Sequence, residues 1–380
     1  MPAATGGEPA RHEGMMEKRI YKIDTTKGIL IFLVVTGHML LPLQGRTRLL
    51  TNLFYAIYCF HMPAFVFLSG ILAFGFVNSE GAVRWKRWLR LVYWYVIFEV
   101  IVFFSEIPAY GKSGDFPDLF HESGSPWYLL CLIEWYLMIP LLRNLKRRLR
   151  GPAGGEARAE ALLGGAILLI SLASGYLRGV GDFLSLDRGF AFAPFFYLGY
   201  FLAEHRLIRV GLGMQKERCR LARLLRAVGA VTLICVFLFL FDRGEAIRNV
   251  FFGTWYDRVW EGPGQQNHWH MLWALRLSWY LLASAVSYLF FCGIPQGRAA
   301  LPERVGQQTL PIYILHRPIR DMLLAAGFFD SINPGSKQSL ALLLLCSFAL
   351  TWLLSCSPVS GLFAVLDAPF RHQKKERPSR

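Results

Sequence analysis

Long runs of apolar residues, separated by short stretches rich in Lys and Arg, dominate this chain of 380 residues. Most runs have roughly 18 residues or more, the length that an α-helix needs to cross about 30 Å of hydrocarbon. The runs lie near residues 28–44, 52–77, 88–108, 126–142, 161–177, 189–204, 225–242, 271–293, 308–328 and 338–357. This pattern predicts an all-α membrane protein, a polytopic bundle of about ten transmembrane helices.

The charges between the runs predict an orientation. If the N-terminus faces the cytoplasm, the cytoplasmic segments hold about 29 of the Lys and Arg residues and the outer loops about 9, and cytoplasmic loops normally carry such an excess. We therefore expect both ends of the chain in the cytoplasm. The predicted segments are a cytoplasmic N-terminal segment (1–27), a transmembrane domain (28–366) and a basic cytoplasmic tail (367–380).

Composition narrows the class further. The hydrophobic fraction of 54% exceeds that of ordinary globular chains. The net charge of +15 would favour nucleic-acid binding in a soluble protein, but the positive-inside bias explains it here, so we expect no nucleic-acid partner. Seven cysteines, an odd number without a C-x-x-C pair, predict small buried hydrophobes rather than disulfides. No cleavage signal follows the first run, which we expect to remain as a span.

Three histidines lie inside predicted spans: His38, His61 and His316. An ionisable side chain in the hydrocarbon layer is costly unless it has a partner or lines a polar cavity. His38 follows the start of its run by about ten residues, roughly 15 Å, which predicts a position near the middle of the bilayer. The other two lie at similar depths, so the three rings could meet in one cavity and serve as a general base. A plain interhelical hydrogen bond would account for His61 equally well.

Other charged residues accompany these histidines. Arg320 and Asp321 lie inside the ninth run, where a polar pair needs a use or an internal partner, and Arg317 beside them could hold a carbonyl or phosphate oxygen. Asp24 and Lys27 have the i, i+3 spacing of a helical ion pair, which would hold Lys27 at the inner mouth of the first span. An interfacial pair of that kind contributes little on its own account.

The outer segment 243–270 is rich in aromatic and amide side chains, among them Trp255, Trp260 and His268. Such residues stack on sugar rings and bond their hydroxyl groups, which predicts an acceptor site at this mouth. The aromatic belt of a membrane interface explains the same composition. His268 and His270 lack a clear third ligand, so we expect no metal.

Several short motifs occur in a distinctive order. They are Arg19–Ile29 with Val34–His38, Phe60–Gly70, Trp127–Pro140 and Tyr313–Pro318. With these motifs the chain resembles the integral-membrane acyltransferase 3 family from residue 19 to about 320, in the branch of the fucose acetylases. That family is marked by Arg or Lys, ten residues and then His, which is the spacing of Lys27 and His38. Many members of that family have acidic residues five and six positions after the Trp that corresponds to Trp127. In this chain the nearest acid, Glu134, comes seven positions after Trp127, which places it on another side of a helix.

The resemblance implies a bacterial inner-membrane enzyme that moves an acyl group from cytoplasmic acyl-CoA to a sugar hydroxyl. In that family the acyl group is usually acetyl and sometimes succinyl. The acceptor would be an envelope polysaccharide, a glycolipid or an exported oligosaccharide. The donor is a substrate, and no bound cofactor is expected. His38 would be the base or acyl carrier, with His61 and His316 beside it. The donor site would hold Lys27, Arg19, Arg317 and Arg320, and the acceptor site Trp127, Glu134, Trp255, Trp260 and His268.

Two other functions fit the same residues. A transporter or flippase for a lipid-linked sugar or small anion also needs intramembrane His and Arg, but it predicts two matching halves with inverted repeats, which the sequence lacks. A non-catalytic membrane sensor or assembly partner would tolerate the loss of all three histidines. The acyl group, the acceptor sugar and the oligomeric state stay open at this point.

Overall fold

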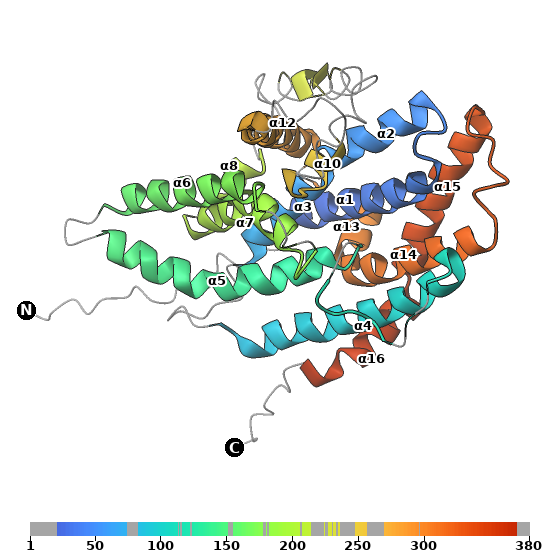
Figure 1. Cartoon of the computed structure of the whole chain (residues 1–380), viewed down its shortest axis with the longest axis horizontal. Coiled ribbons are helices and arrows are strands. Elements are labelled where there is room, and N and C mark those ends of the chain that lie inside the picture. The colour runs from blue at the N-terminus through green and yellow to red at the C-terminus, as the bar shows by residue number, and fades with distance from the viewer. Residues whose placement is uncertain are drawn as a thin grey trace, which may run out of the picture.

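The structure is a computed structural model that describes residues 21–370 except 74–82, 113, 115, 122–123, 151–154, 178–179, 181, 206, 214–223, 225–226, 230, 233–234, 236–247, 257–269 and 296. The longer helices do not all share one direction: several run roughly along the longest axis of the molecule, and one near its right edge crosses that direction (Figure 1). They are α1 (Tyr21–Leu40), α2 (Arg48–Tyr58), α3 (His61–Ala73), α4 (Trp85–Tyr110), α5 (Trp127–Arg150), α6 (Glu156–Ser174), α7 (Leu186–Glu204), α12 (Leu272–Gly293), α14 (Thr309–Ala325) and α15 (Lys337–Leu354). Shorter helices are η1 (Leu41–Leu43), α8 (Ile208–Gly211), α10 (Arg248–Phe251), α13 (Ala300–Gln307), α16 (Ser357–Leu366) and η5 (Ala368–Phe370).

Membrane character is confirmed by seven crossings that are long and apolar enough to span a bilayer within the described residues. They are α1 with η1, α2 with α3, α4, α5, α6, α12 and α15. The described part of the chain contains no strand beyond one isolated bridge, so the prediction of an all-α polytopic membrane protein is confirmed. The count of about ten stays a prediction. The expected spans 189–204 and 308–328 form α7 and α14, and 225–242 lies mostly outside the described residues.

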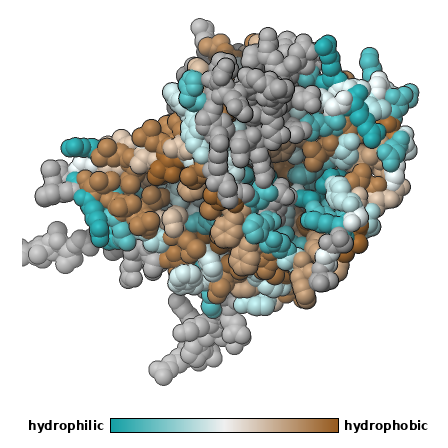
Figure 2. Space-filling view, in the orientation of Figure 1, coloured by the Kyte–Doolittle hydropathy of each residue, from teal (hydrophilic) through white to brown (hydrophobic). Residues whose placement is uncertain are grey.

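The surface agrees with a lipid environment. Hydrophobic residues cover the middle of the visible face, and hydrophilic residues gather toward its left edge and its upper right (Figure 2). Large apolar side chains are exposed on α6 and α15, including Leu169 at 67% and Leu345 at 63%. A soluble protein rarely exposes apolar patches of this extent, whereas a bilayer accommodates them.

The predicted span 52–77 is not one continuous helix. It breaks at Cys59 and Phe60, between α2 and α3. The cause is Pro63, which has no N–H for the carbonyl of Cys59 and whose ring clashes with that carbonyl in a helix. The indole N–H of Trp279 on α12 donates to the freed Cys59 carbonyl at 3.0 Å. The break makes His61 the first residue of α3, one turn from Tyr58.

Helices α3 and α7 approach one another at two glycines. A Cβ atom built on Gly199 would lie 2.1 Å from the carbonyl oxygen of Phe67, and one on Gly70 would lie 1.9 Å from that of Phe196. Any side chain at either position must push the two backbones apart. Small residues permit such close approach in membrane bundles. This contact fixes α7, whose first turn reaches the candidate site.

We expect Gly199→Ala to destabilise the protein by about 1–3 kcal/mol, because the added methyl group overpacks a backbone contact. Thermal unfolding in detergent measures this loss. Gly164→Ala on α6 is the matched control, since a Cβ there meets nothing within 4 Å and alanine favours a helix. Equal melting temperatures for the two variants would show that α3 and α7 do not pack this closely.

The C-terminal segment folds back on α4. The ring of Phe363 on α16 stacks on Trp94 with centroids 4.8 Å apart. Asp367 pairs with Arg90 and accepts a hydrogen bond from the indole of Trp94 at 3.1 Å. Residues 367–370, which we assigned to the basic tail, therefore contact the helical bundle.

Candidate active site

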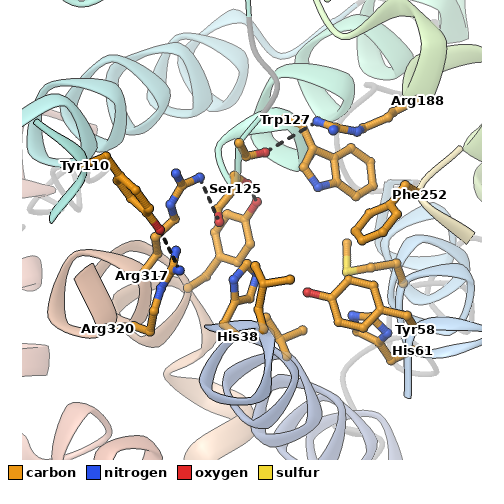
Figure 3. A pocket seen from close by; sticks show the side chains of 15 residues that line it. His38, Tyr58, His61, Tyr110, Ser125, Trp127, Arg188, Phe252, Arg317 and Arg320 are labelled. Atoms are coloured by element: carbon orange, nitrogen blue, oxygen red, sulfur yellow. Dashed lines mark hydrogen bonds between the residues drawn. The ribbon is translucent and has the colours of Figure 1, made fainter. Parts of the chain in front are cut away.

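A cavity of about 250 Å³ lies where α1, α2, α3, α5, α7 and α14 meet. Its lining brings together residues that are far apart in sequence, as Figure 3 shows. His38, His61, Trp127, Arg317 and Arg320, all predicted site residues, are part of it. Tyr58, Tyr110, Ser125, Arg188 and Phe252 also line it, and the sequence analysis did not select them.

The three predicted histidines do converge. His38 and His316 lie edge to face, with ring centroids 4.8 Å apart. His316 is buried behind His38, and His61 borders the cavity from the start of α3. The first helix begins earlier than predicted, however, at Tyr21 and not near 28. His38 therefore lies in the last turn of its helix rather than at its middle.

Backbone carbonyls fix two of the imidazole rings. Nδ1 of His61 lies 2.8 Å from the carbonyl oxygen of Ile57, and Nδ1 of His316 lies 3.0 Å from that of Ile312. A carbonyl oxygen only accepts, so Nδ1 carries a hydrogen in both rings, and in the neutral imidazole Nε2 then keeps its lone pair. Within the described residues, Nε2 of His316 and Nδ1 of His38 are buried without a hydrogen-bond partner. The cluster thus retains unused capacity to accept or relay a proton.

A buried charge network holds the two arginines. Arg317 pairs with Glu106 on α4 and has Nε 3.5 Å from a carboxylate oxygen of Asp321. Arg320 lies 2.8 Å from the other oxygen of Asp321 and donates to the Tyr110 hydroxyl at 2.8 Å. The two buried guanidinium groups face two carboxylates, which lowers the cost of burying them, and the exposed Lys112 pairs with Glu106 from outside. The network orients the guanidinium groups along one wall of the cavity.

Aromatic rings form the opposite wall. Trp127 packs against Phe192 with centroids 5.0 Å apart, and the guanidinium of Arg188 lies 5.6 Å from the centre of the Trp127 ring. Phe252 and Tyr58 extend this wall toward His61, with centroids 5.2 Å apart. Sugar rings stack on such surfaces.

The predicted donor residue Lys27 lies away from the cavity. It pairs with Asp24 at 3.5 Å, as the i, i+3 spacing predicts. By helical rise it is about 16 Å from His38 along α1. The first turns of α1 pack on α13, because Gly28 and Gly306 let the two backbones touch. Arg19 lies outside the described residues.

Two other predicted acceptor residues, Glu134 and Trp255, do not line the cavity. Glu134 faces α7, where a Cβ on Gly189 would lie 2.9 Å from its carboxylate. Trp255 is buried in the core at 2% exposure and does not line the cavity. Trp260 and His268 lie outside the described residues. Among the residues that the structure describes, no cluster of three His, Cys, Asp or Glu side chains has the arrangement of a metal site.

Some of the missed residues carried a sequence signal. Glu106 and Arg188 are charged residues within or at the edge of apolar runs, the same signal that identified His38. Tyr58 and Ser125 carried none, because an aromatic residue in a span and a serine in a loop are common. Only the folded arrangement brings these two to the cavity.

Comparison with known proteins places this geometry in context. A family model described as an acyltransferase domain matches residues 20–358. Nodulation protein NolL of Sinorhizobium fredii (strain NBRC 101917 / NGR234) is 31% identical over 128 residues, 31% of this chain and 35% of that protein. The protein of the same name from Mesorhizobium japonicum (strain LMG 29417 / CECT 9101 / MAFF 303099) is 30% identical over 139 residues, 34% of this chain and 37% of that protein. The chain thus matches little more than a third of these relatives' length, and no solved structure matches it.

Proposed function

Because the chain belongs to the acyltransferase 3 family, whose domain covers residues 20–358, we propose that it acylates sugar hydroxyl groups from within a bacterial inner membrane. Membership confirms the predicted family and the predicted enzyme class, an acyltransferase. The proposed donor is cytoplasmic acyl-CoA carrying an acetyl or succinyl group. The proposed acceptor is an envelope polysaccharide, a glycolipid or an exported oligosaccharide.

One observation carries this proposal most directly. His38 and His61 border a cavity that has guanidinium groups on one wall and stacked aromatic rings on the other. Acyl transfer to a hydroxyl group needs a base for the hydroxyl proton, donors for the developing oxyanion and a surface that orients the acceptor. The cavity offers a side chain for each task. His38 either takes the proton from the sugar or carries the acyl group transiently.

The two ends of α1 suggest a division between donor and acceptor. In the predicted orientation, the segment between α4 and α5 faces away from the cytoplasm, and the cavity residues Tyr110, Ser125 and Trp127 flank that segment. Lys27 lies toward the cytoplasmic end and would attract the phosphates of coenzyme A together with Arg19. The pantetheine arm would then run along α1 and present the thioester to His38. The acceptor would enter the cavity from the outer side.

A transporter or flippase remains the alternative, because it also needs buried His and Arg. The discriminating experiment uses protein purified in detergent, labelled acetyl-CoA or succinyl-CoA, and glycans extracted from the envelope. An acyltransferase consumes the thioester only when acceptor is present, and the mass of the modified glycan identifies the acyl group. Unchanged thioester in the presence of every acceptor fraction, with transport of a sugar or anion into vesicles, would establish the carrier instead.

A further inference from the structure

The hydroxyl group of Tyr58 has no hydrogen-bond partner among the described residues, although its ring is buried at 8% exposure. Other buried tyrosines nearby differ. Tyr313 donates to the carbonyl of Ser125, and Tyr280 donates to that of Ala191 at 2.8 Å. The Tyr58 hydroxyl instead faces the cavity, where a ligand can reach it. In Figure 3 the Tyr58 oxygen points into the open middle of the cavity, on the side opposite Arg317 and Arg320.

The ring that carries this hydroxyl is held on three sides. It stacks on Phe54 with centroids 4.0 Å apart, meets His61 edge to face at 4.8 Å, and contacts Phe252 at 5.2 Å. Such packing leaves the ring little freedom to turn the hydroxyl away. The donor is therefore oriented before any substrate arrives, which is the requirement for an oxyanion hole.

A glycine next to His38 brings this ring close to the base. A Cβ atom on Gly37 would lie 2.7 Å from Cε2 of Tyr58, so no other residue fits there without displacing the ring. Gly37 precedes His38 directly, and Tyr58 and His38 line the same cavity. The imidazole of His38 and the hydroxyl of Tyr58 therefore border the same part of the cavity.

We propose that the Tyr58 hydroxyl donates a hydrogen bond to the carbonyl oxygen of the acyl thioester as that oxygen becomes negative; this assignment rests on the proposed acyl transfer. The acceptor hydroxyl gives its proton to His38, and its oxygen bonds to the thioester carbon. The carbonyl π electrons move to oxygen, which accepts from Tyr58 while Tyr58 keeps its proton. When the C=O bond reforms, the C–S bond breaks, and the thiolate takes the proton from His38.

The arginines are less suited to this task. The guanidinium of Arg317 is directed to Glu106, Asp321 and, at 3.4 Å, the Ser125 hydroxyl. Arg320 is similarly engaged by Asp321 and Tyr110. Several N–H groups of the two guanidiniums are thus engaged before a substrate arrives, whereas the Tyr58 hydroxyl makes no hydrogen bond to a described residue. Attack by His38 itself would place the charge on the same oxygen, so the assignment holds for either nucleophile.

The test is Tyr58→Phe, which removes one oxygen atom and keeps the ring packing. We expect kcat for acyl transfer to fall about 10²–10³-fold, the loss seen when one oxyanion donor is removed. The KM values for acyl-CoA and acceptor should change little, because the bond forms mainly in the transition state. Steady-state kinetics on purified protein in detergent, normalised to folded protein by size-exclusion chromatography, measures both.

Tyr280→Phe is the matched control: it also removes a buried tyrosine hydroxyl, but one bonded to Ser171 and Ala191 outside the cavity. Its kcat should stay near the wild-type value. An unchanged kcat in Tyr58→Phe, or a loss confined to KM, would overturn the assignment. The wild-type rate in the same assay tests the proposed function separately, and its absence would remove both.

Discussion

Replacing His38 with alanine should lower acyl transfer about 10²–10⁴-fold, the usual contribution of a general base, while the protein still inserts and folds. The ring lies in the last turn of α1 and borders the cavity, so its removal leaves space but breaks no hydrogen bond or ion pair within the part of the chain that the structure describes. If His38 carries the acyl group, the loss is larger, because no covalent intermediate can form. Transfer of labelled acyl groups to glycan acceptors measures the effect.

A second histidine serves as the control for this variant. His121 lies in the segment between α4 and α5, has a 59% exposed side chain and pairs with Asp118 at 2.9 Å. His121→Ala should leave transfer near the wild-type rate. Full activity of His38→Ala at normal protein levels would remove His38 from the chemistry. Incubation with labelled acyl-CoA alone also distinguishes the two roles, since only an acyl carrier retains label without acceptor.

Asp321→Asn is expected to cost about 3–5 kcal/mol of stability, enough to deplete the folded protein. Asp321 is fully buried and is the shared carboxylate for Arg317 and Arg320, and it accepts a hydrogen bond from Ser105 at 3.1 Å. An amide carries no charge, so two buried guanidinium groups would be left with Glu106 alone. Thermal unfolding in detergent and the yield of monodisperse protein measure the loss.

The comparison for this variant is Asp367→Asn, which weakens an aspartate–arginine pair at the edge of the bundle. Arg90 in that pair is 44% exposed, so water screens the interaction and the expected change is about 0–1 kcal/mol. If the two variants unfold at the same temperature, Asp321 does not balance buried charge. In that event the orientation of Arg317 and Arg320 would need another explanation.

Hydrophobic run length and ionisable residues predicted much of this molecule. Helical spans carry their signal locally, because each must satisfy its own backbone hydrogen bonds and present apolar side chains to lipid. A histidine in such a run is costly, so His38, His61 and His316 could be identified as one cluster without any structure. The ring contact between His38 and His316, and the cavity that His38 shares with His61, confirm that the three side chains lie close together.

The position of His38 within its helix could not be predicted, because it depends on where α1 starts. A lysine near the start of an apolar run predicts a position outside the span. Lys22 is nevertheless buried, at 1% exposure, in the first turn of α1. Contact with α13, through Gly28 and Gly306, extends the helix to Tyr21. That contact joins residues 28 and 306, which are far apart in the chain, and no local pattern reveals it.

A buried charge also does not always mark an active site. Arg276 is 1% exposed, and it donates to the carbonyl oxygens of Ser171 and Thr254 while its guanidinium lies 4.4 Å from the centre of the Tyr256 ring. It joins α12 to α6 and to the segment after α10, outside the cavity. In the sequence, Arg276 and Arg317 look alike, and only their neighbours distinguish a structural arginine from one that borders the cavity.

The break between α2 and α3, which Pro63 causes, is held rigid by a hydrogen bond from a neighbouring helix. Proline-broken helices can serve as joints, yet here the indole of Trp279 holds the Cys59 carbonyl that Pro63 leaves free. Bending would strip that carbonyl of its partner, and because Cys59 is fully buried no water replaces the lost bond, which costs several kcal/mol. The imidazole of His61 therefore keeps a constant height in the bundle, and conformational changes during turnover have to occur in other elements.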